Sequence, residues 1–390
     1  MRKVTACLLL ALVSFLGRVQ AQSSISGQVL DAETRQPLPG AIVKIGENRG
    51  TTTDANGRFT FGKLPPGVEK LRVSFIGYLP ALVPIQEASE ILLEKTTFVA
   101  DEVIVSATRV NDKAGIAYTN VTVDDIEKQN LGQDLPILLN FTPSMVTTSD
   151  AGAGVGYTSM RIRGSDATRI NMTINGIPLN DPESHGVFFV NMPDFASSVS
   201  SIQIQRGVGS STNGAGAFGA TVNINTNEFN REAYAEINNS YGSFNTWKNT
   251  VKVGSGLLND KFTFDARLSR ISSDGFVDRA SSDLKSYYLS GAYFAKNSYV
   301  RVNVFSGKEK TYQAWNGVPE AKWRDDQEGI LSYIGRNWLN ERDAENLINS
   351  DPRKYNAYWY ENETDNYQQD HYQILSSHNL NRQLTLNLNA

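Results

Sequence analysis

The sequence has little of what metal-binding, disulfide-bonded or nucleic-acid-binding proteins need. Its 390 residues include one cysteine, Cys7, and three histidines. So few thiols and imidazoles cannot build a disulfide framework or a thiolate-rich metal site. The 37 basic and 41 acidic residues give a net charge of −4, which lacks the basic excess of a nucleic-acid-binding domain. We therefore expect no nucleic-acid partner, no bound metal and no cofactor.

Long hydrophobic runs are also scarce. The apolar stretch from Ala6 to Gly17 follows Arg2 and Lys3 and precedes the small-residue exit Val19-Gln20-Ala21. This pattern is typical of a cleaved secretory signal, which we place at residues 1–21. A bilayer-spanning helix needs about 20 apolar residues, and no later stretch provides them. Any membrane crossing must therefore use strands.

The sequence lacks the machinery of the common enzyme classes. Residues 214–219, Gly-Ala-Gly-Ala-Phe-Gly, match a dinucleotide-binding pattern, but a polar loop precedes them and the alternating stretch Thr221–Thr226 follows where a helix is required. Neither a phosphate-binding Gly-Lys-Ser/Thr sequence nor a Gly-x-Ser-x-Gly nucleophile elbow occurs. His185 has no acidic partner at a catalytic spacing. We predict that the protein is not an enzyme and has no catalytic residues.

Glycine, tyrosine and phenylalanine are plentiful instead, with 31, 16 and 17 residues, and they favour strands joined by turns. Residues 22–97 alternate apolar and polar positions between turn clusters at 37–40, 54–57 and 65–67, which predicts a β-sandwich. Asp54 and Asn56 lack the further acids of a calcium loop, so we expect a hairpin turn there. The phrases around Gly27-Gln28-Val29 and Thr53–Phe59 resemble the carboxypeptidase-regulatory-like domain, a non-catalytic sandwich.

The linker of residues 98–110 contains a short β-prone stretch with no core partner of its own. Such a stretch can add to the edge of another protein's sheet, or it can be the last strand of the linker. Its centre resembles the TonB box of TonB-dependent outer-membrane transporters, which implies TonB, with ExbB and ExbD at the inner membrane, as a partner. The residues of this predicted box are Asp101, Glu102, Val103, Ile104, Val105, Ser106 and Ala107.

Residues 111–229 read as a compact α/β unit. We expect helices at Val123–Asn130 and Asp134–Leu139, and strands at Met160–Gly164, Ile170–Leu179 and Ser201–Gly207. The order of these elements is similar to the plug domain of the same transporters, and Phe218–Ile224 matches its closing phrase.

The plug resemblance also implies roles for individual residues. Arg163 and Arg206, each followed by glycine, correspond to plug arginines that pair with barrel glutamates, although they can equally be solvated strand ends. Outward-facing plug residues contact ligand in this family. The candidates here are Asn180, Asp181, Glu183 and His185.

Residues 230–390 carry longer, two-faced strands. We expect strands near 232–241, 246–256, 261–271, 284–295, 298–307, 369–379 and from 382 onward, with alternately short and long connections. This is the signature of a transmembrane antiparallel β-barrel, and the family implies 22 strands when it is complete. We expect a truncated barrel, and therefore an N-terminal fragment of a multidomain, mainly β protein. In the long connection 308–368, Trp315 and Trp359 can stack on a ligand or pack the loop.

Together these features resemble a TonB-dependent outer-membrane receptor. The expected location is the outer membrane of a Gram-negative bacterium, in contact with its lipid and with the sandwich in the periplasm. The stretch Val-Ser-Ala-Thr-Arg after Ile104 resembles receptors for iron-siderophore, haem or cobalamin chelates, so we predict import of a scarce metal chelate. The alternatives are import of oligosaccharides, and a signalling receptor that does not transport.

Overall fold

The structure is a computed structural model of the chain. It describes residues 25–45, 49–62, 68–75, 78–94, 109–110, 115–208, 218–226, 229–259, 261–295, 297–381 and 384–390. The chain forms two compact units, Met1–Val99 and Ala100–Ala390. The predicted signal segment and the predicted box, Asp101–Ala107, lie outside the described residues.

The first unit is a β-sandwich, as predicted. One sheet has the order β4 (Arg58–Phe61), β1 (Ile25–Asp31), β7 (Glu90–Leu93); the other has β3 (Arg49–Thr52), β2 (Ile42–Ile45), β5 (Lys70–Ser74), β6 (Ala81–Pro84). A 3-10 turn, η1 (Ile85–Glu87), precedes β7. The alternating residues Val29, Val43, Phe59, Leu71 and Ile91 point inward and form the core.

The turn before β4 shows why the acidic residue there is needed. The Asp54 carboxylate accepts hydrogen bonds from the backbone N–H groups of Asn56 (2.9 Å) and Arg58 (2.8 Å). Gly57 has φ +70°, where a side chain is strained, and a Cβ would lie 2.6 Å from the Val29 carbonyl oxygen. The predicted hairpin is wrong, because β3 and β4 belong to different sheets: the Asp54 carboxylate closes a turn that leads the chain from one sheet to the other.

The second unit contains a small α/β globule, residues 115–226, which we call the plug. Its main sheet has the order β12 (Ile177–Pro178), β11 (Ile170–Ile174), β14 (Ala220–Asn225), β13 (Ser201–Arg206), β8 (Tyr118–Thr122). The strand predicted around Met160, β10 (Thr158–Ile162), pairs instead with β9 (Met145–Ser149) in a separate hairpin.

Short helices complete the plug. Helix α3 (Val123–Glu127) begins with a capping box of Thr122 and Asp125, and α4 (Leu135–Leu138) begins after Asp134; both are shorter than predicted. Three 3-10 turns follow: η2 (Ala167–Arg169), η3 (Phe189–Asn191) and η4 (Phe195–Ser198). Apolar residues of the sheet, among them Met172, Ile202 and Val222, are fully buried in one core.

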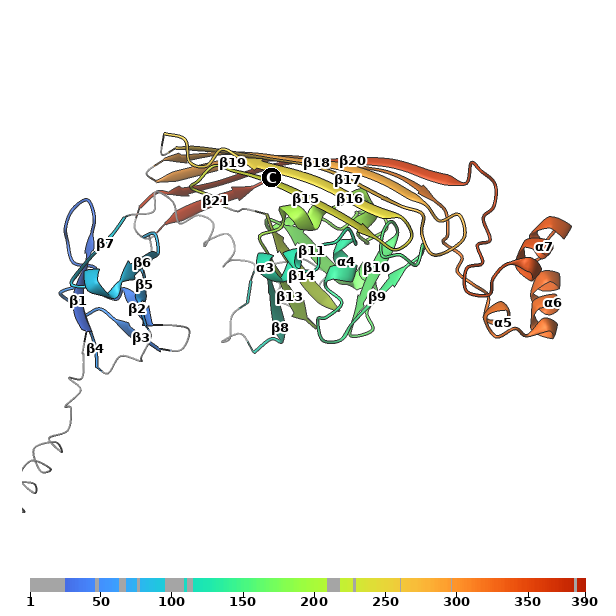
Figure 1. The fold of residues 1–390 in the computed structure, drawn as a ribbon, viewed down its shortest axis with the longest axis horizontal. Coiled ribbons are helices and arrows are strands. Elements are labelled where there is room, and N and C mark those ends of the chain that lie inside the picture. Colours follow the sequence, from blue (N-terminus) through green and yellow to red (C-terminus); the bar gives the residue numbers. More distant parts are fainter. Residues whose placement is uncertain are drawn as a thin grey trace, which may run out of the picture. The chain divides into compact units, whose positions relative to one another are not determined.

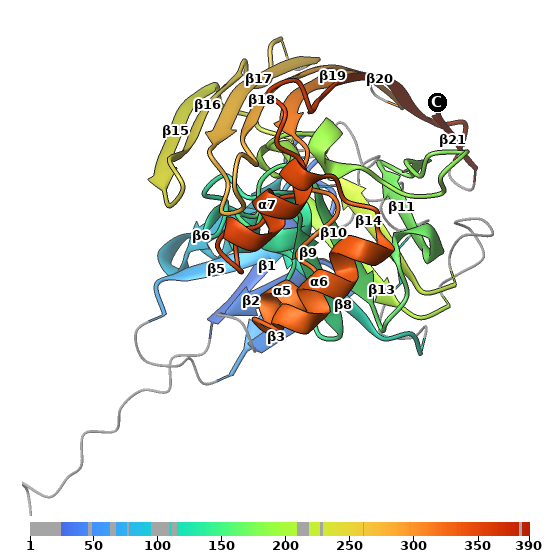
Figure 2. The same cartoon turned by 90° about the vertical axis from the view of Figure 1, so that its right-hand side faces the viewer.

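The rest of the second unit is one seven-stranded antiparallel sheet, which we call the wall. Its strands follow chain order: β15 (Tyr234–Gly242), β16 (Thr246–Gly254), β17 (Phe262–Ser273), β18 (Ser282–Ala295), β19 (Ser298–Tyr312), β20 (Thr364–Asn379), β21 (Thr385–Asn389). They run side by side over the plug (Figures 1 and 2). We call the end of the wall at the β19–β20 connection the loop end. The opposite end, at the β18–β19 connection, is the turn end.

The wall is apolar outside and polar inside. On β17, Phe264 and Leu268 face outward and are 55% and 62% exposed, whereas the alternate residue Arg267 faces the plug and is 3% exposed. A water-soluble sandwich would have the opposite polarity. This arrangement, with the strand order, confirms the predicted partial barrel.

The connection at the loop end contains helices that were not predicted. They are α5 (Glu320–Trp323), α6 (Gln327–Arg336) and α7 (Glu341–Asn349), seen in orange in Figure 1. Asp326 and Asn340 cap α6 and α7 by accepting hydrogen bonds from Gly329 N (3.0 Å) and Asp343 N (2.9 Å). Within the described residues, no helix is long and apolar enough to cross a bilayer.

Candidate functional site at the plug–wall interface

One plug segment, residues 191–198, docks directly on the wall. On β19, a Cβ at Gly307 would lie 1.9 Å from the Asn191 carbonyl oxygen and 2.6 Å from Pro193 Cδ. On the neighbouring β18, the Ser286 hydroxyl donates a hydrogen bond to the Pro193 carbonyl oxygen at 2.6 Å. The plug backbone therefore reaches the wall backbone because Gly307 has no side chain.

This close approach predicts the effect of a single added methyl group. We expect Gly307→Ala to push segment 191–198 off the wall and to cost about 1–3 kcal/mol, the usual cost of overpacking. The loss of stability is measured by thermal unfolding of the purified receptor in detergent. Gly291→Ala on β18 is the matched control, because its Cβ would meet the Phe264 ring at an ordinary 3.4 Å. Equal melting temperatures for the two variants would contradict the assigned contact.

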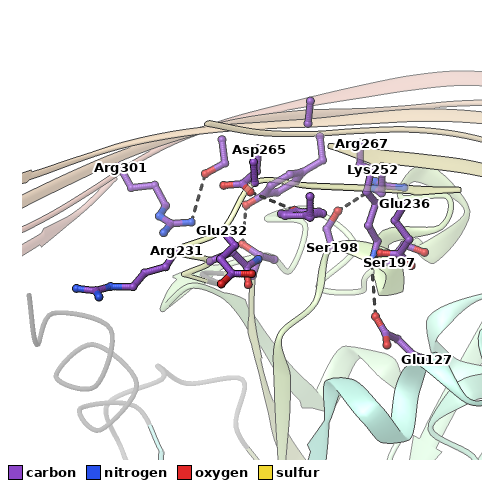
Figure 3. Close-up of a pocket in the computed structure, with 17 residues that line it drawn as sticks. Glu127, Ser197, Ser198, Arg231, Glu232, Glu236, Lys252, Asp265, Arg267 and Arg301 are labelled. Carbon is purple, nitrogen blue, oxygen red and sulfur yellow. Dashed lines mark hydrogen bonds and ion pairs between the residues drawn. The ribbon is translucent and has the colours of Figure 1, made fainter. Parts of the chain in front are cut away.

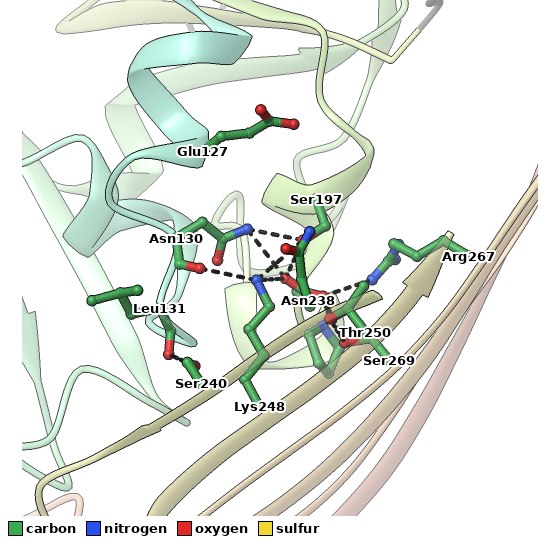
Figure 4. A network of polar contacts seen from close by, with 12 residues as sticks. Glu127, Asn130, Leu131, Ser197, Asn238, Ser240, Lys248, Thr250, Arg267 and Ser269 are labelled. Carbon is green, nitrogen blue, oxygen red and sulfur yellow. Dashed lines mark hydrogen bonds and ion pairs between the residues drawn. The ribbon is translucent and has the colours of Figure 1, made fainter. Parts of the chain in front are cut away.

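Asp194 is the centre of the docked segment, and its side chain is fully buried. It has left-handed backbone dihedrals, φ 51° and ψ 27°, which aim the carboxylate at the wall. Its oxygens lie 3.0 Å from Lys248 Nζ on β16 and 3.6 Å from Arg267 Nη1 on β17. Figure 4 shows this network, which we call the Asp194 anchor.

Hydroxyl and amide groups satisfy the remaining lone pairs of the anchor. The wall supplies Thr250 Oγ1 at 2.5 Å and Ser269 Oγ at 2.6 Å, both donating to Asp194 Oδ2. The plug supplies Ser197 Oγ at 2.6 Å and Asn130 Nδ2 at 3.3 Å, both donating to Oδ1. A buried charge with this many donors is stabilised in its ionised form.

The charge balance of the anchor follows from its partners. Burial alone would raise the pKa of Asp194, but the Arg267 and Lys248 charges and the Ser197 and Ser269 hydroxyls outweigh it and hold this pKa at about 2. Asp194 is therefore ionised throughout the physiological pH range. One carboxylate then faces two cations inside the interface.

A polar cavity of about 590 Å³ lies on the turn-end side of the anchor, and we call it the inner cavity (Figure 3). Plug residues Ser197 and Ser198 form one side of it, and Arg267 forms part of the wall side. Ser198 accepts a hydrogen bond from Arg267 Nε at 2.7 Å. Charged residues of both signs line this cavity: Glu127, Glu232, Glu236, Asp265, Arg231, Lys252, Arg267 and Arg301.

A second cavity, of about 570 Å³, lies on the loop-end side between plug residues 178–192 and the wall strands β19 and β20. We call it the outer cavity. Its described lining includes four carboxylates and no lysine or arginine. The carboxylates are those of Asp181, Glu183, Glu309 and Asp365. An anionic ligand therefore meets like charge on this side.

Three of the four plug residues predicted to contact ligand line the outer cavity: Asn180, Asp181 and Glu183. Two of them also hold their own loop. Asn180 accepts from Met172 N and donates to the Ile170 and His185 carbonyls, and Asp181 accepts from Glu183 N. His185, with φ 59°, shapes the same loop but is not in the lining. Ligand contact by these residues stays a prediction.

Wall and plug also meet inside the outer cavity. The Tyr157 hydroxyl of the plug donates to Asp365 Oδ2, and burial with this carboxylate raises the pKa of Tyr157. Glu309, 1% exposed, accepts from Thr311 at 3.1 Å, while its Oε1 has no hydrogen-bond partner. Glu309 lies close to both Tyr157 and Asp365, so the three side chains form one polar cluster at the cavity.

The two tryptophans singled out from the sequence have different surroundings. Trp315 packs edge-on against Tyr157, with ring centroids 5.4 Å apart, next to the outer cavity. Trp359 is stacked on Tyr360 at 3.9 Å and covered by the Arg342 guanidinium at 3.4 Å. Trp359 therefore packs within the loop, and Trp315 is the better placed of the two for a ligand.

The two predicted locking arginines lie elsewhere. Arg163 is exposed with φ 53°, and Arg206 Nη1 donates to the Pro143 carbonyl at 3.3 Å. Within the described part of the chain neither pairs with a wall glutamate, so their locking role stays a prediction. The anchor that sequence reasoning missed has the opposite polarity, with the acid on the plug and the bases on the wall.

The described residues contain no group of three or more histidine, cysteine, aspartate or glutamate side chains that can hold a metal ion.

Two protein-family models match the chain. The CarboxypepD_reg-like domain matches residues 25–105, and the TonB-dependent receptor plug domain matches residues 111–221. Among curated proteins, TonB-dependent receptor SusC of Bacteroides thetaiotaomicron is 26% identical over 206 residues, covering 50% of this chain and 20% of the relative. TonB-dependent receptor P39 of Formosa agariphila is 29% identical over 163 residues, covering 40% and 15%. The chain thus spans a fifth or less of these relatives.

Solved structures show the same fold at low sequence identity. The FpvAI–pyocin S2 complex matches with a TM-score of 0.56 and 14% identity, covering 94% of this chain and 44% of that one. The closed form of the ferric-catecholate import receptor Fiu of E. coli K12 matches with a TM-score of 0.53 and 15% identity, covering 72% and 37%.

Proposed function

We propose, from the premise that this chain carries the plug and CarboxypepD_reg-like domains of a TonB-dependent outer-membrane receptor, that it imports a small molecule by energy-coupled transport. The receptor's location is the outer membrane of a Gram-negative bacterium, with the N-terminal domain on the periplasmic side. The relatives are named as receptors, and we propose no enzymatic role for the chain.

The observation that carries the proposal is the polarity of the wall around the plug. An apolar outer face suits lipid, and a polar inner face suits a lumen that fills with water once the plug moves. The plug closes that lumen through the charged contacts of the Asp194 anchor, together with apolar contacts to Tyr288 and Phe305 of the wall. A pulling force on the plug can break these plug–wall contacts, and the contacts can form again when the force ends.

The force is proposed to enter through the predicted box, Asp101–Ala107. Strand addition to TonB uses backbone N–H and C=O groups, so it depends on the main chain more than on side chains. We expect Val103→Pro to remove one backbone donor and to abolish uptake while leaving surface binding intact. Val103→Thr, which keeps the N–H group and a β-branched side chain, is the control and should import normally. Normal uptake by the proline variant would contradict coupling through this stretch.

For the substrate, we retain the metal chelate suggested by the box as the first candidate. The outer cavity limits which chelates are suitable. Its four carboxylates, without a lysine or arginine in the described lining, disfavour a chelate with net negative charge. The same lining favours a second candidate, a neutral oligosaccharide, since carboxylates accept hydrogen bonds from hydroxyl groups and aromatic rings such as Tyr157 and Tyr367 can pack on sugar faces.

A growth experiment separates these candidates. The source bacterium with the receptor gene deleted, and complemented with wild type, Val103→Pro or Val103→Thr, is grown on limiting ferric chelates of different charge, haem, cobalamin and single oligosaccharides. A defect limited to one class names the ligand. A defect on anionic ferric chelates alone would contradict the charge argument, and rescue by the proline variant would favour a receptor that does not transport.

A further inference from the structure

The docked segment 191–198 separates the two cavities. Asn191 and Met192, at its start, line the outer cavity, and Ser197 and Ser198, at its end, line the inner cavity. Asp194 lies between them and binds the wall. One short stretch of plug is therefore the partition between two spaces of about 570 and 590 Å³, each of a size that holds a small ligand.

The partition is held by two unlike kinds of contact. Toward β16 and β17, the segment is held by the charges and hydroxyls of the Asp194 anchor. When these contacts break, water can hydrogen-bond to each of the separated groups. Toward β18 and β19 it uses aromatic packing, with Phe195 against Phe305 at 5.3 Å between ring centroids and Phe305 against Tyr288 at 5.8 Å. The polar side is the one that opens without exposing apolar surface.

We propose that segment 191–198 is the gate of a permeation route between the plug and strands β16 and β17, and that release of Asp194 joins the outer and inner cavities. The inference rests on the proposed transport function. The ligand class follows from the route: a polar molecule without net negative charge, which enters past the carboxylates of the outer cavity and continues into the mixed charges of the inner one.

A cysteine reporter tests the gate without knowledge of the ligand. Residues 8–390 contain no cysteine, so Ser290→Cys, 6% exposed in the lining of the inner cavity, adds the reporter thiol, and any cysteine beyond residue 390 is replaced by serine. Living cells are treated with a neutral, membrane-impermeant maleimide small enough for either cavity. Glu361→Cys, exposed at the loop end, reports surface folding and should react in every background.

We expect the Ser290→Cys reporter to react in coupled cells and to lose reactivity with Val103→Pro. Adding Asp194→Asn to the uncoupled reporter should restore labelling by about tenfold or more, since the gate no longer needs force. Asp124→Asn, the same change at an exposed plug carboxylate, is the matched control. Unchanged labelling with Asp194→Asn overturns the gate, whereas equal labelling with and without Val103→Pro overturns the coupling proposal.

A tether distinguishes a gate from a loosened plug. Asp194→Cys with Ser269→Cys places two thiols where the carboxylate and hydroxyl oxygens are 2.6 Å apart, and oxidation should fix the segment to β17. With the disulfide formed, we expect the Ser290→Cys reporter to stay unlabelled in coupled cells. Labelling of the inner cavity with the tether intact would show that the route lies elsewhere and would overturn the proposal.

Discussion

Asp194→Ala is expected to lower the stability of the closed plug by about 3–5 kcal/mol, because it removes one partner of a buried ion pair and leaves the other charges unpaired. Lys248 and Arg267 would remain in the interface with side chains 3% and 4% exposed and without their carboxylate. The measurement is the melting temperature of the purified receptor, together with protease protection of the plug.

The control for this prediction removes the stranded charge as well. Asp194→Ala combined with Lys248→Met should recover part of the loss, because the interface then holds one uncompensated cation instead of two. If the double variant is as unstable as the sum of the two single variants, Lys248 and Asp194 do not interact. A melting temperature of Asp194→Ala equal to that of wild type would contradict the anchor.

The anchor should tolerate mild acid. A carboxyl group with a lowered pKa contributes stability that is complete above its unfolded pKa, about 3.9, and lost as the pH falls through its folded pKa, here about 2. Between pH 5 and pH 8 the Asp194 contribution is therefore constant. A gate opened by mild acidification would require another group.

Asp134→Asn is expected to produce the largest change in pH dependence. Burial raises the pKa of Asp134 to about 8, against the opposing hydrogen bonds from Thr158 and the Gly156 backbone. The folded plug then binds a proton that the unfolded chain releases near pH 3.9, so stability falls as the pH rises from about 4 to 8, by up to about 1.4 kcal/mol per pH unit.

The asparagine variant should remove that slope, because it keeps a neutral group of the same shape. Melting temperatures of wild type and Asp134→Asn, compared from pH 5 to pH 8, check this. Asp124→Asn, an exposed plug carboxylate, should leave the wild-type slope in place. Parallel curves for wild type and Asp134→Asn would show that Asp134 is ionised in the folded plug throughout this range.

Much of the architecture could be predicted from local patterns. Alternation such as Phe262-Thr263-Phe264 reports a strand with one apolar face, and the wall strands lie close to their predicted positions. The alternation weakens where β20 begins, because Thr364–Asp370 contains almost no apolar residue. The predicted strand therefore started at residue 369, later than the observed one. The helices between β19 and β20 were missed because they are short: their signals are the caps Asp326 and Asn340 and a few apolar residues, such as Ile330 and Leu347.

The candidate site was only partly predictable, since it depends on contacts distant in sequence. The loop of Asn180 and Asp181 could be identified from resemblance to plug domains. Nothing local marks Asp194, whose importance comes from Lys248 and Arg267 on strands far along the chain. A polar side chain at alternating wall positions indicates only that the position faces inward, not which plug residue it meets.

The inner face of the wall has one further consequence. Its buried groups, such as Thr250, Ser269 and Arg267, are ones that water solvates well. When the plug withdraws, hydration can replace each of these contacts without any rearrangement of the strands. The polar part of the wall is thus compatible with a folded domain and with solvent, whereas the buried apolar residues Ile271, Leu284 and Phe305 favour the docked plug.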